Sequence, residues 1–246
     1  MKIQQLLRDN EARAKAQPAV NVIQNAGEAS LYIYGVIAEW GVSAQGVAQA
    51  LAGLKVDTLH VYINSPGGDV MEGRAIMAEL RRFPGKAIAH IDALCASAAT
   101  SIAMACGEVQ MSEGAFFMIH EAMGPCFGSK QDMRMTADLL EKVEGSIVDD
   151  YKAKTGKEED EIRAWMNAET WFSASEAKEH GFVDSITTAD KKAKNTWNLA
   201  AFDKTPEALK APPPDPQPEE HQNEPATAGF FMSAANANRL RLLQIA

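Results

Sequence analysis

Apolar and polar residues alternate along the middle of the chain with two different periods. Short apolar runs rich in β-branched and aromatic residues predict strands, and between them apolar residues recur at helical spacing. The predicted strands are 31–37, 58–65, 86–91, 108–112 and 115–120. We expect one helix that begins after Ser43, a good N-cap, and a second helix over about 69–82. This alternation predicts an α/β domain with mostly parallel strand pairing.

The helical period continues in the second half of the chain and is then lost. We expect a long helix over 131–155 that Gly156 ends, and shorter helices over 158–167 and 174–181. Residues 205–229 hold seven of the eleven prolines, which predicts an extended, disordered spacer. The predicted organisation is an N-terminal segment 1–29, a folded domain 30–190, a proline-rich linker 191–229 and an apolar C-terminal segment 230–246.

Composition narrows the classes of function. The net charge of -9 and the lack of a basic run argue against a nucleic-acid partner. Residues 87–107 have the length of a membrane span, but His90 and Asp92 interrupt them and most of the rest is Ala and Ser. The first twenty residues lack a signal-peptide core, and three cysteines are typical of reduced thiols. We therefore expect a soluble, cytoplasmic protein without a membrane partner.

Three stretches carry candidate chemistry. Ser97 and Ser101 lie in a run of small residues, 92–107, which is otherwise typical of a tightly packed helix. The turn "NSPGGDV" joins a strand to a helix, where glycines let a substrate backbone approach and an N–H can hold negative charge. His120 ends an apolar strand beside a Gly-containing loop. A serine nucleophile, a histidine base and backbone donors are what acyl transfer from a peptide requires. Glu169 and Asp184 are both candidates for the carboxylate that orients the histidine.

Four motifs in this order, "INSPGGDV", "CASAATSIAMA", "MIH" and "ETWFSASEAKEHGFVDSI", resemble the proteolytic subunit of the Clp protease. More narrowly they are similar to the phage and prophage branch, the head maturation proteases. The resemblance covers about 30–188. It implies a crotonase-like spiral of βαβ units that forms rings, with Ser97, His120 and Glu169 as catalytic residues. It further implies an oxyanion hole from the N–H groups of Gly68 and Ala98. In the family pattern the position of Asp184 is read as structural rather than catalytic.

The resemblance also implies partners. We expect protein or peptide substrates, a homo-oligomer of one ring or of stacked rings, and either an ATPase unfoldase or a capsid or scaffold protein as partner. No metal or other cofactor is expected, and a phage-encoded protein would act in the host cytoplasm. A crotonase-type acyl-CoA enzyme and a non-catalytic ring or scaffold protein remain alternatives. Because every motif precedes it, truncation after about residue 195 is expected to leave peptide hydrolysis intact.

Overall fold

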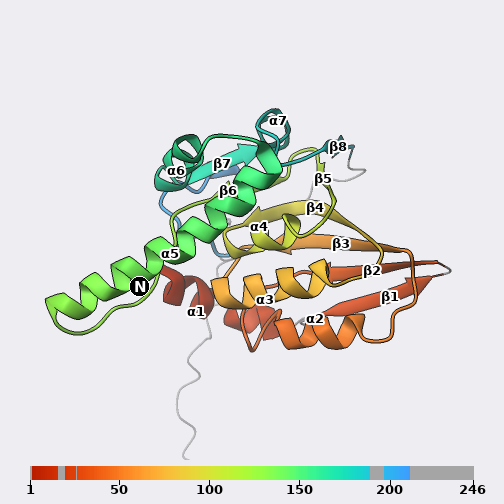
Figure 1. The fold of residues 1–246 in the computed structure, drawn as a ribbon, viewed down its shortest axis with the longest axis horizontal. Coiled ribbons are helices and arrows are strands. Elements are labelled where there is room, and N and C mark those ends of the chain that lie inside the picture. The colour runs from red at the N-terminus through yellow and green to blue at the C-terminus, as the bar shows by residue number, and fades with distance from the viewer. Residues whose placement is uncertain (1, 16–19, 26, 189–196, 211–246) are drawn as a thin grey trace, which may run out of the picture. The chain divides into compact units, whose positions relative to one another are not determined.

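The computed structural model describes residues 2–15, 20–25, 27–188 and 197–210. The predicted segment 230–246 and most of the predicted linker lie outside these residues. Helices and strands alternate as the hydrophobic pattern predicts (Figure 1). The helices are α1 (Lys2–Lys15), α2 (Ala44–Leu51), α3 (Val70–Arg81), α4 (Ala98–Ala103), α5 (Lys130–Thr155), α6 (Glu159–Asn167) and α7 (Ala174–Glu179). The strands are β1 (Asn21–Asn25), β2 (Glu28–Ile33), β3 (Thr58–Ser65), β4 (Lys86–Ala96), β5 (Glu108–Ser112), β6 (Phe116–Ile119), β7 (Thr170–Ser173) and β8 (Ser185–Thr187).

The long strand β4 organises the sheet. Its first half pairs in parallel with β3 and β5, and its last residues, Leu94–Ala96, pair in parallel with β6. The main order is β1-β2-β3-β4-β5-β8, and β6 leaves this path to pair with β7. Among the described strands, only β1–β2 and β6–β7 pair antiparallel. The predicted α/β class with mostly parallel pairing is confirmed.

Local signals start and end the helices. Ser43 caps α2 by accepting from the N–H of Gly46, and the Asp69 carboxylate caps α3. Ser129 begins α5 with a capping box, and Gly156 ends it in the left-handed conformation with φ 68°. Among the described residues, no helix is both long and apolar enough to cross a membrane.

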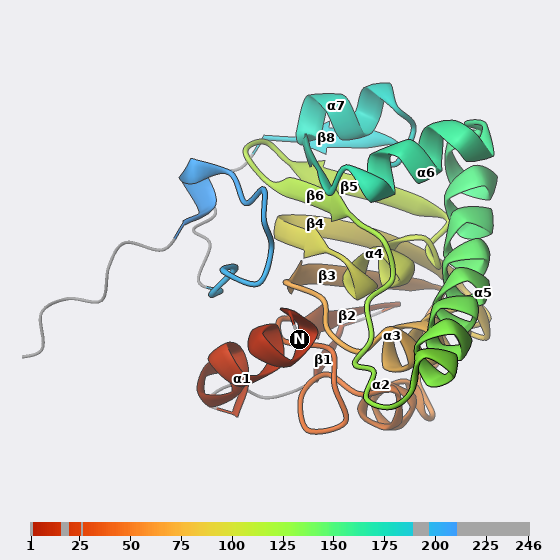
Figure 2. The same ribbon diagram turned by 90° about the vertical axis from the view of Figure 1, so that its left-hand side faces the viewer.

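Side chains on the two faces of the strands build two apolar clusters. Along β4, Cys95 packs into the larger cluster with α3, α4 and α5, whereas Leu94 and Ala96 point to the opposite face, because successive strand side chains alternate. The second cluster is completed by α1 and by residues 197–210, which lie on the other side of the strands from α5 (Figure 2). Its buried members are Leu6, Val36, Ala38, Leu94, Ala96, Met118, Trp197, Leu199, Ala201, Phe202 and Leu209.

This second cluster corrects the predicted boundaries. Residues 197–210, assigned to a linker from the sequence, pack against the strands. The predicted N-terminal segment likewise contributes Leu6, which is 1% exposed. Neither stretch has a sustained period of apolar residues, so its burial depends on a surface that distant strands provide. The sequence also predicts β4 to end at residue 91, whereas its small residues continue the strand to Ala96.

Candidate active site

Ser97 occupies a sharp turn between β4 and α4. Its backbone has φ 55° and ψ −127°, a conformation that costs a residue with a side chain about 1–3 kcal/mol. The turn is held by the N–H of Ser97, which donates to the carbonyl of Met118 at 2.9 Å. The N–H and hydroxyl of Thr100 both donate to the carbonyl of Ser97, at 2.9 and 2.6 Å. A strained turn from strand to helix exposes a hydroxyl beyond the backbone, and here it directs Ser97 Oγ into a cavity.

His120 reaches this hydroxyl from the end of β6. Pairing of β6 with β4 sets Met118 opposite Ala96, so the residues that follow each strand are neighbours. His120 Nε2 and Ser97 Oγ are joined by a hydrogen bond of 2.7 Å. Ser101 lines the same cavity one helical turn further along, but this hydrogen bond is made to Ser97. The structure therefore brings two of the predicted residues into direct contact.

Two buried cysteines in the same small-residue run as Ser97, Cys95 and Cys106, are not competing nucleophiles. Burial raises the pKa of the Cys95 thiol well above its ordinary value, and burial raises that of Cys106 to a pKa of about 12. Both are therefore protonated at neutral pH, and the thiolate is the reactive form. Neither residue lines the cavity.

The double-glycine turn lies beside Ser97 and is shaped by contacts within the protein. Gly67 and Gly68 have φ of 87° and 146°, which residues with a side chain rarely adopt. A Cβ on Gly67 would lie 2.8 Å from the Cβ of Ser97, and a Cβ on Gly68 would lie 2.1 Å from the carbonyl oxygen of Ile37. From the sequence we expected Gly68 to lack a side chain so that a substrate can approach. The structure corrects this, because the Ile37 backbone fills the space that a side chain on Gly68 would need.

Gly68 and Ala98, whose backbone N–H groups are candidate donors, both line the cavity with Ser97. Gly68 lies at the turn before α3, and Ala98 is the first residue of α4, where N–H groups have no partner within the helix. Within the residues that the structure describes, neither N–H donates to a protein acceptor. Both are therefore available to an oxygen that carries negative charge beside Ser97 Oγ.

The cavity has a volume of about 380 Å³. Ser97 and His120 form part of its wall, and the extended segment 121–125, Leu7 of α1 and Ile147 of α5 contribute to the rest. Its walls thus come from segments that are far apart in the sequence. A mostly apolar cavity with a few convergent polar groups is the usual form of a small binding site.

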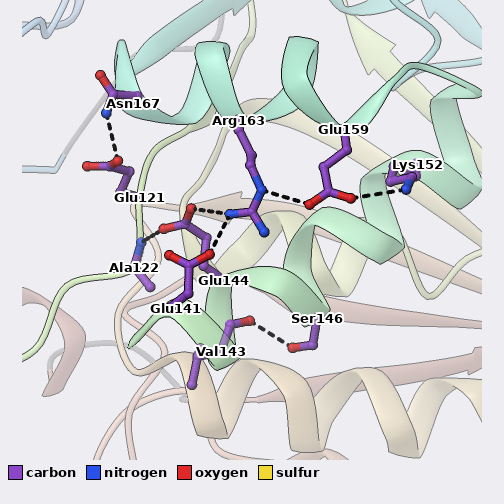
Figure 3. Close-up of polar contacts among 10 residues, drawn as sticks. All are labelled: Glu121, Ala122, Glu141, Val143, Glu144, Ser146, Lys152, Glu159, Arg163 and Asn167. Atoms are coloured by element: carbon purple, nitrogen blue, oxygen red, sulfur yellow. Dashed lines mark hydrogen bonds and ion pairs between the residues drawn. The ribbon is translucent and has the colours of Figure 1, made fainter. Parts of the chain in front are cut away.

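A polar network fixes the segment that follows His120 (Figure 3). The N–H of Ala122 donates to the Glu144 carboxylate of α5 at 3.4 Å, and Asn167 of α6 donates to Glu121 at 2.8 Å. Arg163 of α6 joins the two helices by an ion pair of 3.0 Å with Glu144. Burial raises the pKa of Glu144, against the opposing effects of Ala122 and Arg163. The cavity wall is thereby tied to α5 and α6.

Glu169 lies beside His120 at the end of the paired strands β6 and β7, but its carboxylate accepts hydrogen bonds from other residues. Antiparallel pairing sets Thr170 opposite Ile119, so Glu169 and His120 flank the same end of β6 and β7. The Glu169 carboxylate accepts from the N–H groups of Asp203 and Lys204 at 2.9 and 2.7 Å, and from Trp171 Nε1 at 3.2 Å. Among the described residues, no hydrogen bond joins Glu169 to His120.

The two positive φ values outside glycine both occur in this region. Among the described residues, only Ser97 and Glu169 combine a side chain with such a backbone, at φ 55° and 48°. Strain of this kind persists where the surroundings over-determine it, and it gathers at functional sites. Both strained residues lie at strand ends that flank His120, Ser97 after β4 and Glu169 before β7.

Asp184, the other candidate carboxylate, belongs to a different part of the fold. It accepts from the N–H of Val109 at 2.7 Å and from Lys154 at 2.6 Å, just before β8. It does not line the cavity. Within the described ranges, no group of three or more His, Cys, Asp or Glu side chains is placed to hold a metal ion.

Comparison with known proteins identifies the family. Residues 20–190 match the Clp protease family over more than half of the chain. The chain belongs to the Clp protease family. The ATP-dependent Clp protease proteolytic subunits of Streptococcus pneumoniae strains Hungary19A-6 and CGSP14 are each 31% identical over 132 residues, which covers 52% of this chain and 67% of theirs. A mutant ClpP1 from Listeria monocytogenes has a similar fold, with a TM-score of 0.59 at 23% identity over 65% of this chain and 92% of that one.

The sequence did not predict the role of residues 197–210, which lie beyond the part of the chain that matches the Clp protease family. Phe202 packs against the imidazole of His120 with ring centroids 5.5 Å apart, and the next two residues bind Glu169 through their N–H groups. Backbone donors leave no trace in the sequence. The available signal was Trp197 and Phe202, two large aromatic residues in a stretch assigned to a linker, where few aromatic residues are expected.

Proposed function

We propose that this chain is a serine endopeptidase that hydrolyses peptide bonds of protein substrates inside an oligomeric chamber. The hydrogen bond of 2.7 Å between Ser97 Oγ and His120 Nε2, at a strained turn that lines a cavity, carries the proposal. A nucleophile and its base within this distance are the signature of covalent acyl transfer. Membership of the Clp protease family supports the same chemistry.

In the proposed mechanism Ser97 Oγ attacks the carbonyl carbon of the peptide bond, and its proton passes to His120 Nε2. The N–H groups of Gly68 and Ala98 hold the oxyanion of the tetrahedral intermediate. His120 then donates its proton to the leaving amine, which breaks the C–N bond and leaves an acyl group on Ser97. A water molecule activated by His120 hydrolyses this ester and restores both residues.

We propose Glu169 as the carboxylate of the site. Its position beside His120 at the ends of β6 and β7, and its strained φ of 48°, support this role over that of Asp184. A carboxylate has about four acceptor positions, so three N–H donors leave it capacity for a further partner. Its negative charge next to the imidazole would stabilise the imidazolium that forms during each transfer.

The two other functions considered from the sequence fit the site less well. A crotonase-type acyl-CoA enzyme would need neither a serine at 97 nor a histidine bonded to it. A scaffold protein without activity would have no reason to keep the strained backbone of Ser97, which costs stability without a packing benefit. The Ser97–His120 contact therefore favours the hydrolase.

We further propose that the chain acts as a homo-oligomeric ring, single or stacked, with an ATPase unfoldase or a capsid or scaffold protein as partner. Its motifs and its proline-rich extension support a place in the phage and prophage branch and a role in head maturation. Exposed apolar residues on the first half of α5 support assembly, because such residues on a free surface are typical of a protein–protein contact.

Active-site labelling tests the proposed function. A fluorophosphonate probe should label the wild type, while Ser97→Ala should remain unlabelled and lose peptide hydrolysis by about a millionfold, the usual cost of removing such a nucleophile. Ser101→Ala is the matched control, since Ser101 lines the same cavity and should keep labelling and activity. Labelling that survives Ser97→Ala, or that disappears only with Ser101→Ala, would contradict the assignment.

A further inference from the structure

Residues 197–210, which we call the strap, are anchored firmly to the fold. The side chains of Trp197, Leu199 and Phe202 are between 1% and 5% exposed. A reciprocal pair of hydrogen bonds, both of 2.8 Å, ties Asn198 to the buried Asn10 of α1. The Trp197 indole also donates to Asn64 at the end of β3. The strap is therefore held at one end by α1 and by β3.

The middle of the strap contacts both residues that assist Ser97 in the proposed mechanism. The Phe202 ring lies against the His120 imidazole at 5.5 Å and against the Trp171 indole at 5.8 Å. The next two residues, Asp203 and Lys204, donate their N–H groups to the two oxygens of the Glu169 carboxylate. One short segment thus packs on the base and binds the carboxylate beside it.

The strap makes these contacts from outside the cavity. Residues of α1, α3, α4 and α5 contribute to the cavity wall, together with the segment after His120, but no residue of 197–210 does so. The strap therefore does not touch a substrate that fills the cavity. Its direct contacts with the proposed catalytic residues are those with His120 and Glu169.

We propose that the strap is a positioning element of the catalytic site, in which Phe202 fixes the imidazole of His120 and the backbone of Asp203 and Lys204 fixes the carboxylate of Glu169. This inference rests on the proposed serine peptidase function. His120 lies just beyond a strand end, where a side chain keeps rotamer freedom unless packing removes it. A displacement of about 1 Å of a catalytic group can cost a hundredfold in rate, so a fixed ring and carboxylate raise the turnover number. The expectation that truncation near residue 195 spares hydrolysis is therefore reversed.

Two substitutions at Lys204 in the full chain separate the backbone donor from the side chain. Lys204→Pro removes the N–H that donates to Glu169 at 2.7 Å, whereas Lys204→Ala keeps the N–H and removes only the side chain, which reaches the carbonyl of Ala168. We expect Lys204→Pro to lower kcat for a fluorogenic peptide about tenfold or more, with KM within about twofold of the wild type. Lys204→Ala should lose far less of kcat than Lys204→Pro, because it keeps the N–H that binds Glu169. Labelling of Ser97 should slow in parallel with kcat.

A second pair of variants tests the contact with the base. Phe202→Ala should lower kcat and the labelling rate, and Phe202→Leu, which refills most of the space, should restore most of both. Particle size and Tm of every variant show whether it is folded. Unchanged kcat in Lys204→Pro, an equal loss in Lys204→Ala, or a loss confined to KM would overturn the strap inference. A wild type that neither hydrolyses peptides nor labels at Ser97 would instead overturn the proposed function, and the inference would fall with it.

Discussion

Ser97 and Glu169 share a backbone conformation that neither side chain favours. Each lies where a strand meets a turn, and each is held by hydrogen bonds to a segment distant in sequence: Ser97 to Met118, and Glu169 to the strap. At the scale of single residues, the site thus stores local strain that the surrounding strands compensate. The Glu169 carboxylate is held there by the N–H groups of Asp203 and Lys204 in the strap.

The role proposed for Glu169 predicts a difference from Asp184. Glu169→Gln removes the charge and replaces one acceptor oxygen by an NH₂ group that faces N–H donors, so kcat should fall about a hundredfold or more. Asp184→Asn should leave kcat close to the wild-type value and lower Tm instead, because Asp184 bonds Val109 and Lys154. Steady-state kinetics and thermal melts of both variants make the comparison. A folded but inactive Asp184→Asn beside an active Glu169→Gln would reverse the assignment.

At the scale of elements, β3 and β4 carry a polar aromatic row on the face opposite the larger core. His60 Nδ1 and His90 Nε2 are 2.9 Å apart, and the ring of Tyr62 stacks on His90 at 4.7 Å. Burial and the neighbouring His60 lower the pKa of His90, while Glu108 of β5 acts in the opposite direction. On the outer side, His60 lies 3.5 Å from Glu28 of β2. Two charged imidazoles at this distance would repel each other.

This pair predicts a loss of stability in acid. Because the pKa of His90 is lower in the folded chain than in the unfolded chain, the unfolded chain binds the proton more readily. Stability is then full above the ordinary histidine pKa of about 6.5 and declines as the pH falls below it. His90→Gln should reduce the fall in Tm between about pH 7.5 and about pH 5.5. Melting curves at both pH values test this, and an equal fall in both proteins would contradict it.

At the scale of the whole molecule, the first half of α5 extends away from the strands (Figure 1) and exposes apolar side chains. Met135 and Leu139 are 61% and 57% exposed, and they lie one helical turn apart on one face. Phe127, just before the helix, is 76% exposed. These residues form the surface on which the proposed assembly of rings depends.

Leu139→Glu should therefore reduce the size of the particle measured by sedimentation velocity, because burying a charge without a partner is costly. Ala137→Glu is the matched control, since Ala137 is exposed on the opposite side of the same helix and should leave the particle size unchanged. An unchanged particle in Leu139→Glu would show that this face is not a subunit contact.

Local physics accounts for what the sequence by itself determined. The period-two alternation of β3, the caps Ser43 and Asp69 and the αL glycine Gly156 are each determined by a few adjacent residues, so their elements could be predicted to within a residue or two. The motifs that contain Ser97 and His120 are also local. Ser97 and His120, which are 23 residues apart, come into contact because β4 and β6 pair in parallel and end side by side.

Tertiary structure decided the rest. Leu6 and the apolar residues of 197–210 have no period of their own, and they are buried only because β4, β6 and residues 36–38 present apolar side chains on a second face. Two of the three N–H groups that bind Glu169 are backbone groups more than thirty residues away, and a backbone donor has no signature in the residue types. The clash that requires Gly68 comes from the Ile37 backbone, which only the folded chain brings close. Such contacts depend on the mutual placement of distant segments, which local patterns do not encode.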